Sequence, residues 1–224
     1  YNRGKIPILV GGTGFYIQAV LNDIAFTKEK QGDEIRADLQ NLAKEKGASY
    51  LHHELQKVDK ESAEAIHPNN IKRVIRALEY FQSTGQKFSD HNKEERQKGS
   101  PYNFLYLVLT MNRKVLYERI DKRVDQMMEE GLVKEVKQLL DAGYSRNLVS
   151  MQGLGYKEIA SALFKECTME EAVYRLKRDT RHFAKRQMTW FRRERDVTMI
   201  NKDNFSNNHE IVNYIMKLAV EKGI

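Results

Sequence analysis

"IPILVGGTGFYIQAVL", residues 6–21, reads as a buried strand, a turn with three glycines and the start of a helix. In an open α/β sheet, ligands bind at the carboxyl ends of parallel strands. Thr13 stands among the glycines at such a joint, so its hydroxyl is placed to face a substrate. The same hydroxyl is equally suited to capping the helix that follows. The stretch therefore predicts an α/β architecture and leaves two roles open for Thr13.

Two further apolar segments, FLYLVLT (residues 104–110) and VTMI (residues 197–200), predict strands. Continuous apolar strands are typical of a parallel sheet covered on both faces. A charged region with helical periodicity separates the first two strands. We therefore predict an α/β core of residues 1–27 and 100–224, interrupted by an all-helical insertion of residues 28–99. Helical periodicity marks five further segments, which are residues 113–131, 132–143, 156–166, 168–195 and 208–221.

The amino-acid composition limits the classes of protein to which this chain can belong. The 224 residues are 41% hydrophobic, which supports a substantial core and excludes a disordered chain. Lys and Arg exceed Asp and Glu by 38 to 31, and a clustered excess favours polyanionic partners such as nucleic acid. The single cysteine, Cys167, excludes an internal disulfide, and the six histidines lack metal-ligand spacing. We expect a monomer in the reducing cytoplasm with no membrane partner.

The segment from Thr168 predicts one long helix, opened by a capping box between Thr168 and Glu171. At 100° per residue, its apolar stripe comprises Ala172, Val173, Leu176, Phe183, Trp190 and Phe191. The opposite face carries Arg178, Arg181, Lys185, Thr189 and Arg192. Acidic residues are almost absent from that face, which favours contact with a phosphate backbone. A solvated charged face is the alternative.

The stretch IHPNNIKRVIRALEYFQSTG (residues 66–85) predicts a shorter helix that ends at Gly85. Its buried face comprises Ile71, Val74, Ile75, Leu78 and Phe81. Arg73, Arg76 and Tyr80 lie together on the opposite face, with Lys72 at its side. Two guanidinium groups beside an aromatic ring suit an unstacked base. An ordinary surface helix is the alternative.

Arg119 and Arg123 stand four residues apart on one helix face, a spacing that suits a pyrophosphate. Salt-bridged surface arginines are the alternative, because three acidic residues are close by. The loop SMQGLGYKE (residues 150–158) leads into a helix and is too generic to identify a ligand by itself. No G-x-x-x-x-G-K-[ST] loop occurs in the sequence.

Taken together, five segments resemble the tRNA dimethylallyltransferase family, also called tRNA isopentenyltransferase, in its bacterial form. They are IPILVGGTGFYIQAVL, VDKESAEAIHPNNIKRVIRALEYFQSTG, LTMNRKVLYERIDKRVDQMMEEGLVKEVKQLL, SMQGLGYKEI and AKRQMTWFRR. Their order and spacing match over nearly the whole chain. The resemblance implies a P-loop-kinase-like core, and transfer of a prenyl group from dimethylallyl diphosphate to N6 of adenosine 37, beside the anticodon of tRNA. It also implies Mg²⁺ at the diphosphate.

The resemblance also implies roles for residues. Thr13 lines the reaction channel, and Gly11, Gly12 and Gly14 let the substrate approach the backbone. Either Arg119 or Arg123 faces the diphosphate. The residues expected to contact tRNA are Lys72, Arg73, Arg76, Gln152, Lys157, Lys185, Arg186, Gln187 and Arg192, to which the two basic faces add Tyr80, Arg178 and Arg181.

The nucleotide-binding P-loop of the family, and an Asp-Ser-x-Gln stretch with the catalytic base, do not occur in this sequence. We expect both to precede Tyr1 and the chain alone to be inactive. A noncatalytic RNA-binding module is the alternative, and a P-loop and Asp motif upstream would decide for the enzyme. A small-molecule kinase with the same core is a third interpretation, but that function would not explain the basic face of residues 178–192.

Overall fold

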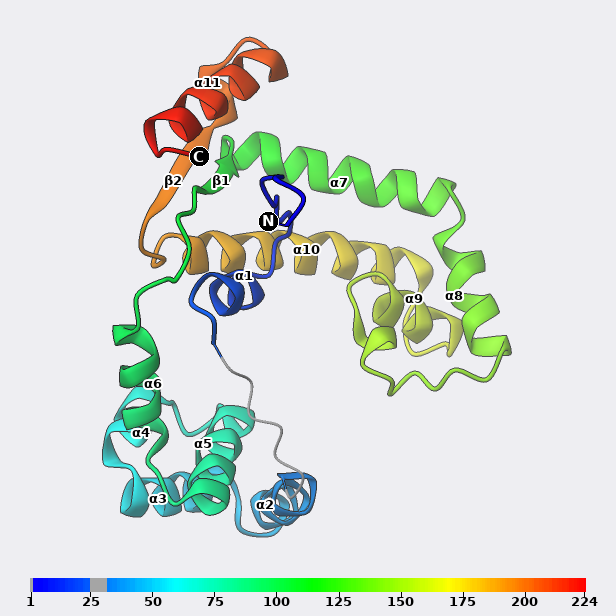
Figure 1. Cartoon of the computed structure of the whole chain (residues 1–224). Helices are drawn as coiled ribbons and strands as arrows, with labels where there is room; N and C mark the ends of the chain where they lie inside the picture. The colour runs from blue at the N-terminus through cyan, green and yellow to red at the C-terminus, as the bar shows by residue number, and fades with distance from the viewer. Residues whose placement is uncertain (1, 25–31) are drawn as a thin grey trace. The chain divides into compact units, whose positions relative to one another are not determined.

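The computed structural model describes residues 2–24 and 32–224, which divide into two compact units (Figure 1). One unit joins Tyr1–Gly14 to Asn103–Ile224, and the other is Phe15–Tyr102. The predicted boundary after residue 27 lies outside the described residues. The observed division instead places most of helix α1 (Gly14–Leu21) with the helical unit.

The helical unit contains no strand among its described residues. Its remaining helices are α2 (Gly32–Lys46), α3 (Ala48–Val58), α4 (Lys60–Ala65), α5 (Ile71–Thr84) and α6 (Phe88–Gln97). Apolar side chains from α2, α3 and α5 meet in one core that includes Leu39, Leu55 and Val74. As predicted, α5 ends at Gly85, whose positive φ of 71° suits a residue without a Cβ.

A buried carboxylate joins two helices of this unit. Asp59, only 1% exposed, accepts a hydrogen bond from the Ser62 amide at 3.0 Å and so caps α4. Its second oxygen accepts from the Ser89 amide in the first turn of α6, at 2.8 Å. Burial raises the pKa of Asp59, but the hydrogen bonds from Ser62 and Ser89 outweigh burial, so that the pKa lies below the ordinary value.

The other unit is the α/β core, and its two strands pair in parallel as predicted. Strand β1 (Tyr106–Thr110) runs beside β2 (Val197–Asn201), with Tyr106 opposite Val197. Its other elements are α7 (Arg113–Glu129), α8 (Leu132–Asp141), η1 (Ser150–Gln152), α9 (Tyr156–Leu163), α10 (Met169–Phe191), η2 (Lys202–Asn204) and α11 (Asn208–Glu221). Helices α7 and α10 run side by side (Figure 1).

The prediction of a buried strand at IPILV is wrong for this structure. Residues 5–11 form no strand, and Ile8 and Val10 are 84% and 87% exposed. A strand needs a neighbouring backbone to satisfy its amides and carbonyls. Among the described residues β1 pairs only with β2, so the apolar segment has no ladder partner.

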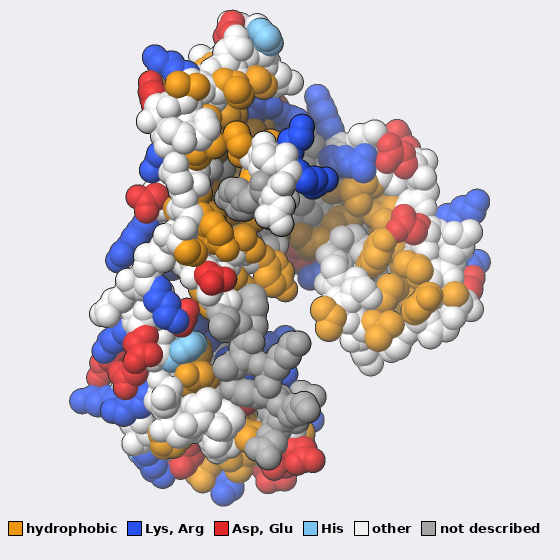
Figure 2. Space-filling model, in the orientation of Figure 1, with side chains coloured by type: hydrophobic (Ala, Val, Ile, Leu, Met, Phe, Trp, Pro, Cys, Tyr) orange, Lys and Arg blue, Asp and Glu red, His pale blue; other side chains and the backbone are white. Residues whose placement is uncertain are grey.

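Apolar side chains also reach the surface around α8 and α9 (Figure 2). They include Val149 and Phe164, which are 91% and 53% exposed. No helix in the described parts of the chain is long and apolar enough to cross a membrane.

Candidate nucleic-acid interface

The glycine turn is held against helix α10. The side-chain amide of Gln187 donates a hydrogen bond to the carbonyl oxygen of Gly12 at 2.8 Å. A Cβ atom on Gly14 would lie only 2.2 Å from Nε1 of Trp190, whereas one on Gly11 would meet no atom within 4 Å. Glycine at positions 12 and 14 is therefore explained by the approach of α10. Only Gly11 has open space in which a substrate could lie.

Thr13 stands between these two contacts and directly precedes α1. Its side chain is exposed, and its hydroxyl forms no hydrogen bond with another described residue. The turn is thus anchored on both sides of Thr13 while the hydroxyl itself stays accessible. A contact with a substrate remains a prediction.

The basic face of α10 is less uniform in charge than predicted. The Arg181 guanidinium lies 2.5 Å from Oδ1 of Asp121 on α7, and Nε of Arg178 lies 2.8 Å from Oδ1 of Asp179. Arg178 lowers the pKa of Asp179. The prediction that acidic partners are almost absent from this face is therefore wrong for both arginines. Helical periodicity cannot show Asp121, which α7 supplies, whereas Asp179 is the next residue of α10 itself.

The later cations of α10 differ from these pairs. Lys185, Arg186 and Arg192 are exposed, and none makes an ion pair with any residue that the structure describes. The Arg186 guanidinium lies 5.9 Å from the ring centre of Phe183. Gln187, which is also expected to contact tRNA, holds the glycine turn through its side-chain amide. The accessible positive charge of α10 is thus concentrated toward its C-terminal end, next to that turn.

The predicted apolar stripe of α10 is buried only in part. Ala172, Leu176 and Phe191 are 0%, 2% and 8% exposed, as expected. Phe183 and Trp190 are 42% and 40% exposed, and so they are not core residues. The first turns of α10 pack into the core formed with α7, α8 and α9, whereas Trp190 faces the glycine turn.

Two predicted RNA-contacting segments meet in one cavity of about 520 Å³ between α9 and α10. Gln152, Lys157 and Arg178 all line it. Arg146 and Arg175, which the sequence did not single out, line it as well. The side-chain amide of Gln152 donates to the backbone oxygen of Arg146 at 2.7 Å.

Carboxylates moderate the positive charge of this cavity. Glu166 accepts two hydrogen bonds from the Arg146 guanidinium, which lowers the pKa of Glu166 to about 2. Buried Glu158 accepts from the Gly155 amide at 2.9 Å and so caps α9. Its other oxygen lies 3.4 Å from Nζ of Lys157. Arg175 is exposed and makes no ion pair within the described part of the chain.

Arg119 and Arg123, one of which is expected to face the diphosphate, have different surroundings on α7. The Arg123 guanidinium lies 3.1 Å from a carboxylate oxygen of Glu130. Arg119 makes only a 3.9 Å contact with the sulfur of Met111. Of the two, Arg119 therefore has the guanidinium that is not neutralised by a described carboxylate.

In the helical unit, Lys72 and Arg73 are exposed on α5 as predicted. Tyr80 is not: its side chain is 4% exposed, stacked on His91 at 4.8 Å and edge-on to Phe88 at 5.7 Å between ring centres. The prediction that Tyr80 shares the exposed face is wrong, because α6 folds back over this side of α5. The ring is not available to stack on a base.

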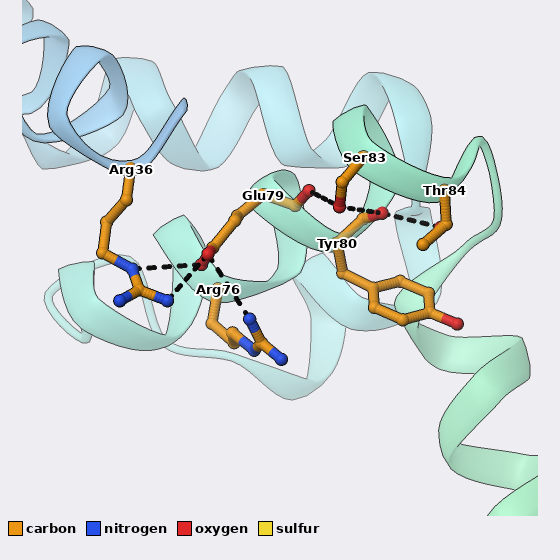
Figure 3. A network of polar contacts seen from close by, with 6 residues as sticks. All are labelled: Arg36, Arg76, Glu79, Tyr80, Ser83 and Thr84. Carbon is orange, nitrogen blue, oxygen red and sulfur yellow. Dashed lines mark hydrogen bonds and ion pairs between the residues drawn. The ribbon is translucent and has the colours of Figure 1, made fainter. Parts of the chain in front are cut away.

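Glu79, one turn after Arg76, is 1% exposed and lies between two arginines (Figure 3). Its Oε1 atom is 2.7 Å from the Arg36 guanidinium of α2 and 3.4 Å from that of Arg76. Arg76, expected at tRNA, is thus held by a carboxylate that also joins α2 to α5.

The family model for IPP transferase matches residues 1–194. The chain belongs to the IPP transferase family. A tRNA dimethylallyltransferase of Lachnoclostridium phytofermentans is 56% identical over 224 residues, covering 100% of this chain and 72% of that relative. The family expected from the sequence is thereby confirmed.

Solved structures of the family agree with this assignment. The full-length tRNA isopentenylpyrophosphate transferase of Bacillus halodurans is 43% identical, with a TM-score of 0.65 over 99% of this chain and 69% of that one. A eukaryotic dimethylallyltransferase acting on tRNA is 30% identical, with a TM-score of 0.70 over 89% of this chain and 52% of that one. These neighbours confirm the predicted fold class, a partial P-loop-like α/β core that is mostly helical overall.

Proposed function

We propose that this chain modifies tRNA by transfer of a dimethylallyl group, with dimethylallyl diphosphate as donor and N6 of adenosine 37 as acceptor. Membership of the IPP transferase family supports the reaction class. Within the structure, the observation that carries the proposal is the glycine turn. Gln187 and Trp190 anchor it on either side of an exposed Thr13, at the end of α10 that bears accessible cations.

The reaction sets clear demands. A bond forms between N6 and the first prenyl carbon, the bond from that carbon to the diphosphate oxygen breaks, and N6 loses one proton. Adenine must first leave the anticodon stack, since a stacked base cannot reach the donor. We assign to Thr13 a hydrogen bond with one of the reacting groups, which an anchored turn would hold in place at little entropic cost.

The departing diphosphate needs positive charge. We assign this contact to Arg119 rather than Arg123, because Glu130 neutralises Arg123. Magnesium at the diphosphate is part of the proposal from the family resemblance. The described residues contain no group of three or more His, Cys, Asp or Glu side chains able to hold a metal ion, so they offer no protein ligand set for it.

The RNA backbone would contact two surfaces of the α/β unit. One is the group of accessible cations Lys185, Arg186 and Arg192. The other is the cavity lined by Gln152 and Lys157. Since the P-loop and Asp motifs do not occur in this sequence, we propose that RNA binding is the property of this polypeptide by itself and that transfer requires both motifs.

The test compares Thr13→Ala with Thr13→Ser in a protein that carries both motifs. We expect Thr13→Ala to lower prenyl transfer at least about tenfold, or about 1.4 kcal/mol of transition-state stabilisation. Thr13→Ser should retain most activity because the hydroxyl remains. Transfer is measured by mass spectrometry of the tRNA nucleosides, and thermal unfolding checks the fold. Equal transfer by Thr13→Ala and wild type would refute the assigned contact.

The noncatalytic alternative makes a different prediction for the wild-type protein. An RNA-binding module would bind an anticodon stem-loop and yet produce no dimethylallyl adenosine when both motifs and donor are present. Binding without any transfer would therefore overturn the proposed function.

A further inference from the structure

The side chain of Gln187 differs in its surroundings from the cations that precede it in the sequence. Lys185 and Arg186 are exposed, whereas Gln187 is half-buried and its side-chain nitrogen lies 2.8 Å from the carbonyl oxygen of Gly12. A Cβ atom on Gly12 would lie only 2.5 Å from that nitrogen. The hydrogen bond therefore depends on glycine at position 12, because a Cβ atom there would displace the amide.

The C-terminal part of α10 has two sides with different surroundings. At 100° per residue, Trp190 lies about 60° from Gln187 around the helix, whereas Lys185 and Arg192 lie about 140–160° from it. Gln187 and Trp190 both approach the glycine turn. Lys185 and Arg192 are exposed on the other side. An RNA backbone held by these two cations therefore need not reach Gln187.

The hydrogen bond from Gln187 acts on the peptide that links Gly12 to Thr13. A peptide unit is planar, so the carbonyl oxygen of Gly12 lies in one plane with the amide nitrogen and the Cα atom of Thr13. Glycine has the widest choice of backbone conformations. Gly11 and Gly12 form no backbone–backbone hydrogen bond with any residue that the structure describes. Holding the Gly12 oxygen thus restrains the backbone from which the Thr13 side chain projects.

We propose that Gln187 is a positioning residue for prenyl transfer, which orients the Thr13 hydroxyl through the Gly12–Thr13 peptide and adds nothing to RNA affinity. The inference rests on the proposed function for the role of Thr13. It gives Gln187 a role different from the tRNA contact that the family resemblance implies. Restraint of a group that acts in the transition state speeds the chemical step without tightening substrate binding. Loss of the hydrogen bond should therefore lower kcat and leave KM for tRNA unchanged.

The experiment measures kcat and KM for transfer to a tRNA anticodon stem-loop, in a protein that carries the P-loop and Asp motifs. Gln187→Met is the test variant, because methionine has a similar length and cannot donate a hydrogen bond. Gln187→Lys is the matched variant, because its ammonium group keeps a donor within reach of the Gly12 oxygen. Lys185→Met removes a cation from the other side of α10. Fluorescence anisotropy of a labelled stem-loop gives Kd, and thermal unfolding checks the fold.

We expect Gln187→Met to lower kcat about fivefold to tenfold, the usual effect of one lost hydrogen bond, and to leave KM, Kd and Tm unchanged. Gln187→Lys should retain most of kcat. Lys185→Met should instead raise Kd and flatten its dependence on salt. A rise in Kd with unchanged kcat in Gln187→Met would overturn the proposal and make Gln187 an RNA contact. Equal losses of kcat in Gln187→Met and Gln187→Lys would also overturn it, since the donor would then have no effect.

A double-mutant cycle tests the contact itself. Gly12→Ala places a methyl group where the Gln187 amide lies, so it breaks the same hydrogen bond from the other side. If this bond carries the effect, Gly12→Ala/Gln187→Met should lose no more kcat than the more impaired single variant. Additive losses would show that the two residues act independently, and the proposal would be wrong.

The outcome for Gln187 is separable from that for the proposed function. Equal rates of transfer by the wild type and Gln187→Met would leave the function intact and refute the positioning role. A wild type that binds the stem-loop and transfers no dimethylallyl group would overturn the proposed function, and this inference with it.

Discussion

Replacing Gly14 by alanine tests whether helix α10 shapes the glycine turn. A Cβ atom there would lie 2.2 Å from Cδ1 and Nε1 of Trp190 and 3.1 Å from Cε2. Carbon atoms in contact need about 3.5–4.0 Å, so the indole must move by more than about 1 Å. Overpacking of this kind costs about 1–3 kcal/mol. Because Trp190 is 40% exposed, its ring can swing outward, and the lower half of that range applies.

Gly11→Ala is the matched control, because a Cβ at Gly11 meets no atom within 4 Å. For a chain of 224 residues, a cost of about 1–2 kcal/mol lowers Tm by about 2–8 °C in Gly14→Ala, and we expect Gly11→Ala to leave Tm unchanged. Trp190 is the only tryptophan, so tryptophan fluorescence reports on the surroundings of this one side chain. The emission of Gly14→Ala should shift to the red as the ring enters water.

The two variants should also separate structure from substrate contact. Gly14→Ala lowers transfer because the turn that carries Thr13 shifts. Gly11→Ala lowers transfer only if the substrate occupies the open space at Gly11, and then with no change in Tm or emission. The packing argument is refuted if Gly14→Ala matches Gly11→Ala in both Tm and fluorescence.

Three further predictions concern a buried carboxylate, a paired arginine and a buried tyrosine ring. The pKa of Asp59 is lowered on folding, so its contribution to stability is present above about pH 3.8 and is lost as pH falls through its lower folded pKa. Asp59→Asn should cost about 2 kcal/mol at pH 7, and the free energy of unfolding in urea should then vary less with pH between pH 2 and 5. Arg181→Ala should reduce the salt dependence of RNA binding less than Lys185→Ala, because Asp121 already neutralises Arg181. Tyr80→Ala should destabilise the helical unit by about 3 kcal/mol in urea unfolding and leave discrimination between stem-loops with altered loop bases unchanged.

Most helices and both paired strands could be predicted from the sequence because their signals are local. The sequence shows a capping box between Thr168 and Glu171 and a glycine at position 85. In the structure one helix begins after Thr168 and another ends at Gly85. The segment IPILV has a strand composition, but a strand also needs a partner backbone. Local sequence carries no information about that partner.

The candidate site was predicted less completely for the same reason. Periodicity assigns a side chain to a face of its own helix, and it does so correctly for Arg181. It cannot show Asp121, which stands 60 residues earlier on α7. Nor can it show α6, which covers Tyr80.

Ion pairing sorts the predicted RNA-contacting cations into two kinds with different energetics. A phosphate that approaches Arg178 or Arg181 must compete with a carboxylate already within 2.8 Å, so the gain from the new contact is offset by the loss of the old one. A phosphate that approaches Lys72 or Lys185 displaces only water and counterions, and the release of counterions drives binding. The salt-dependent part of the affinity should therefore come from the unpaired cations, while the pair of Arg181 with Asp121 chiefly joins α10 to α7. A basic face drawn from sequence alone overstates the number of phosphate contacts, because it counts both kinds equally.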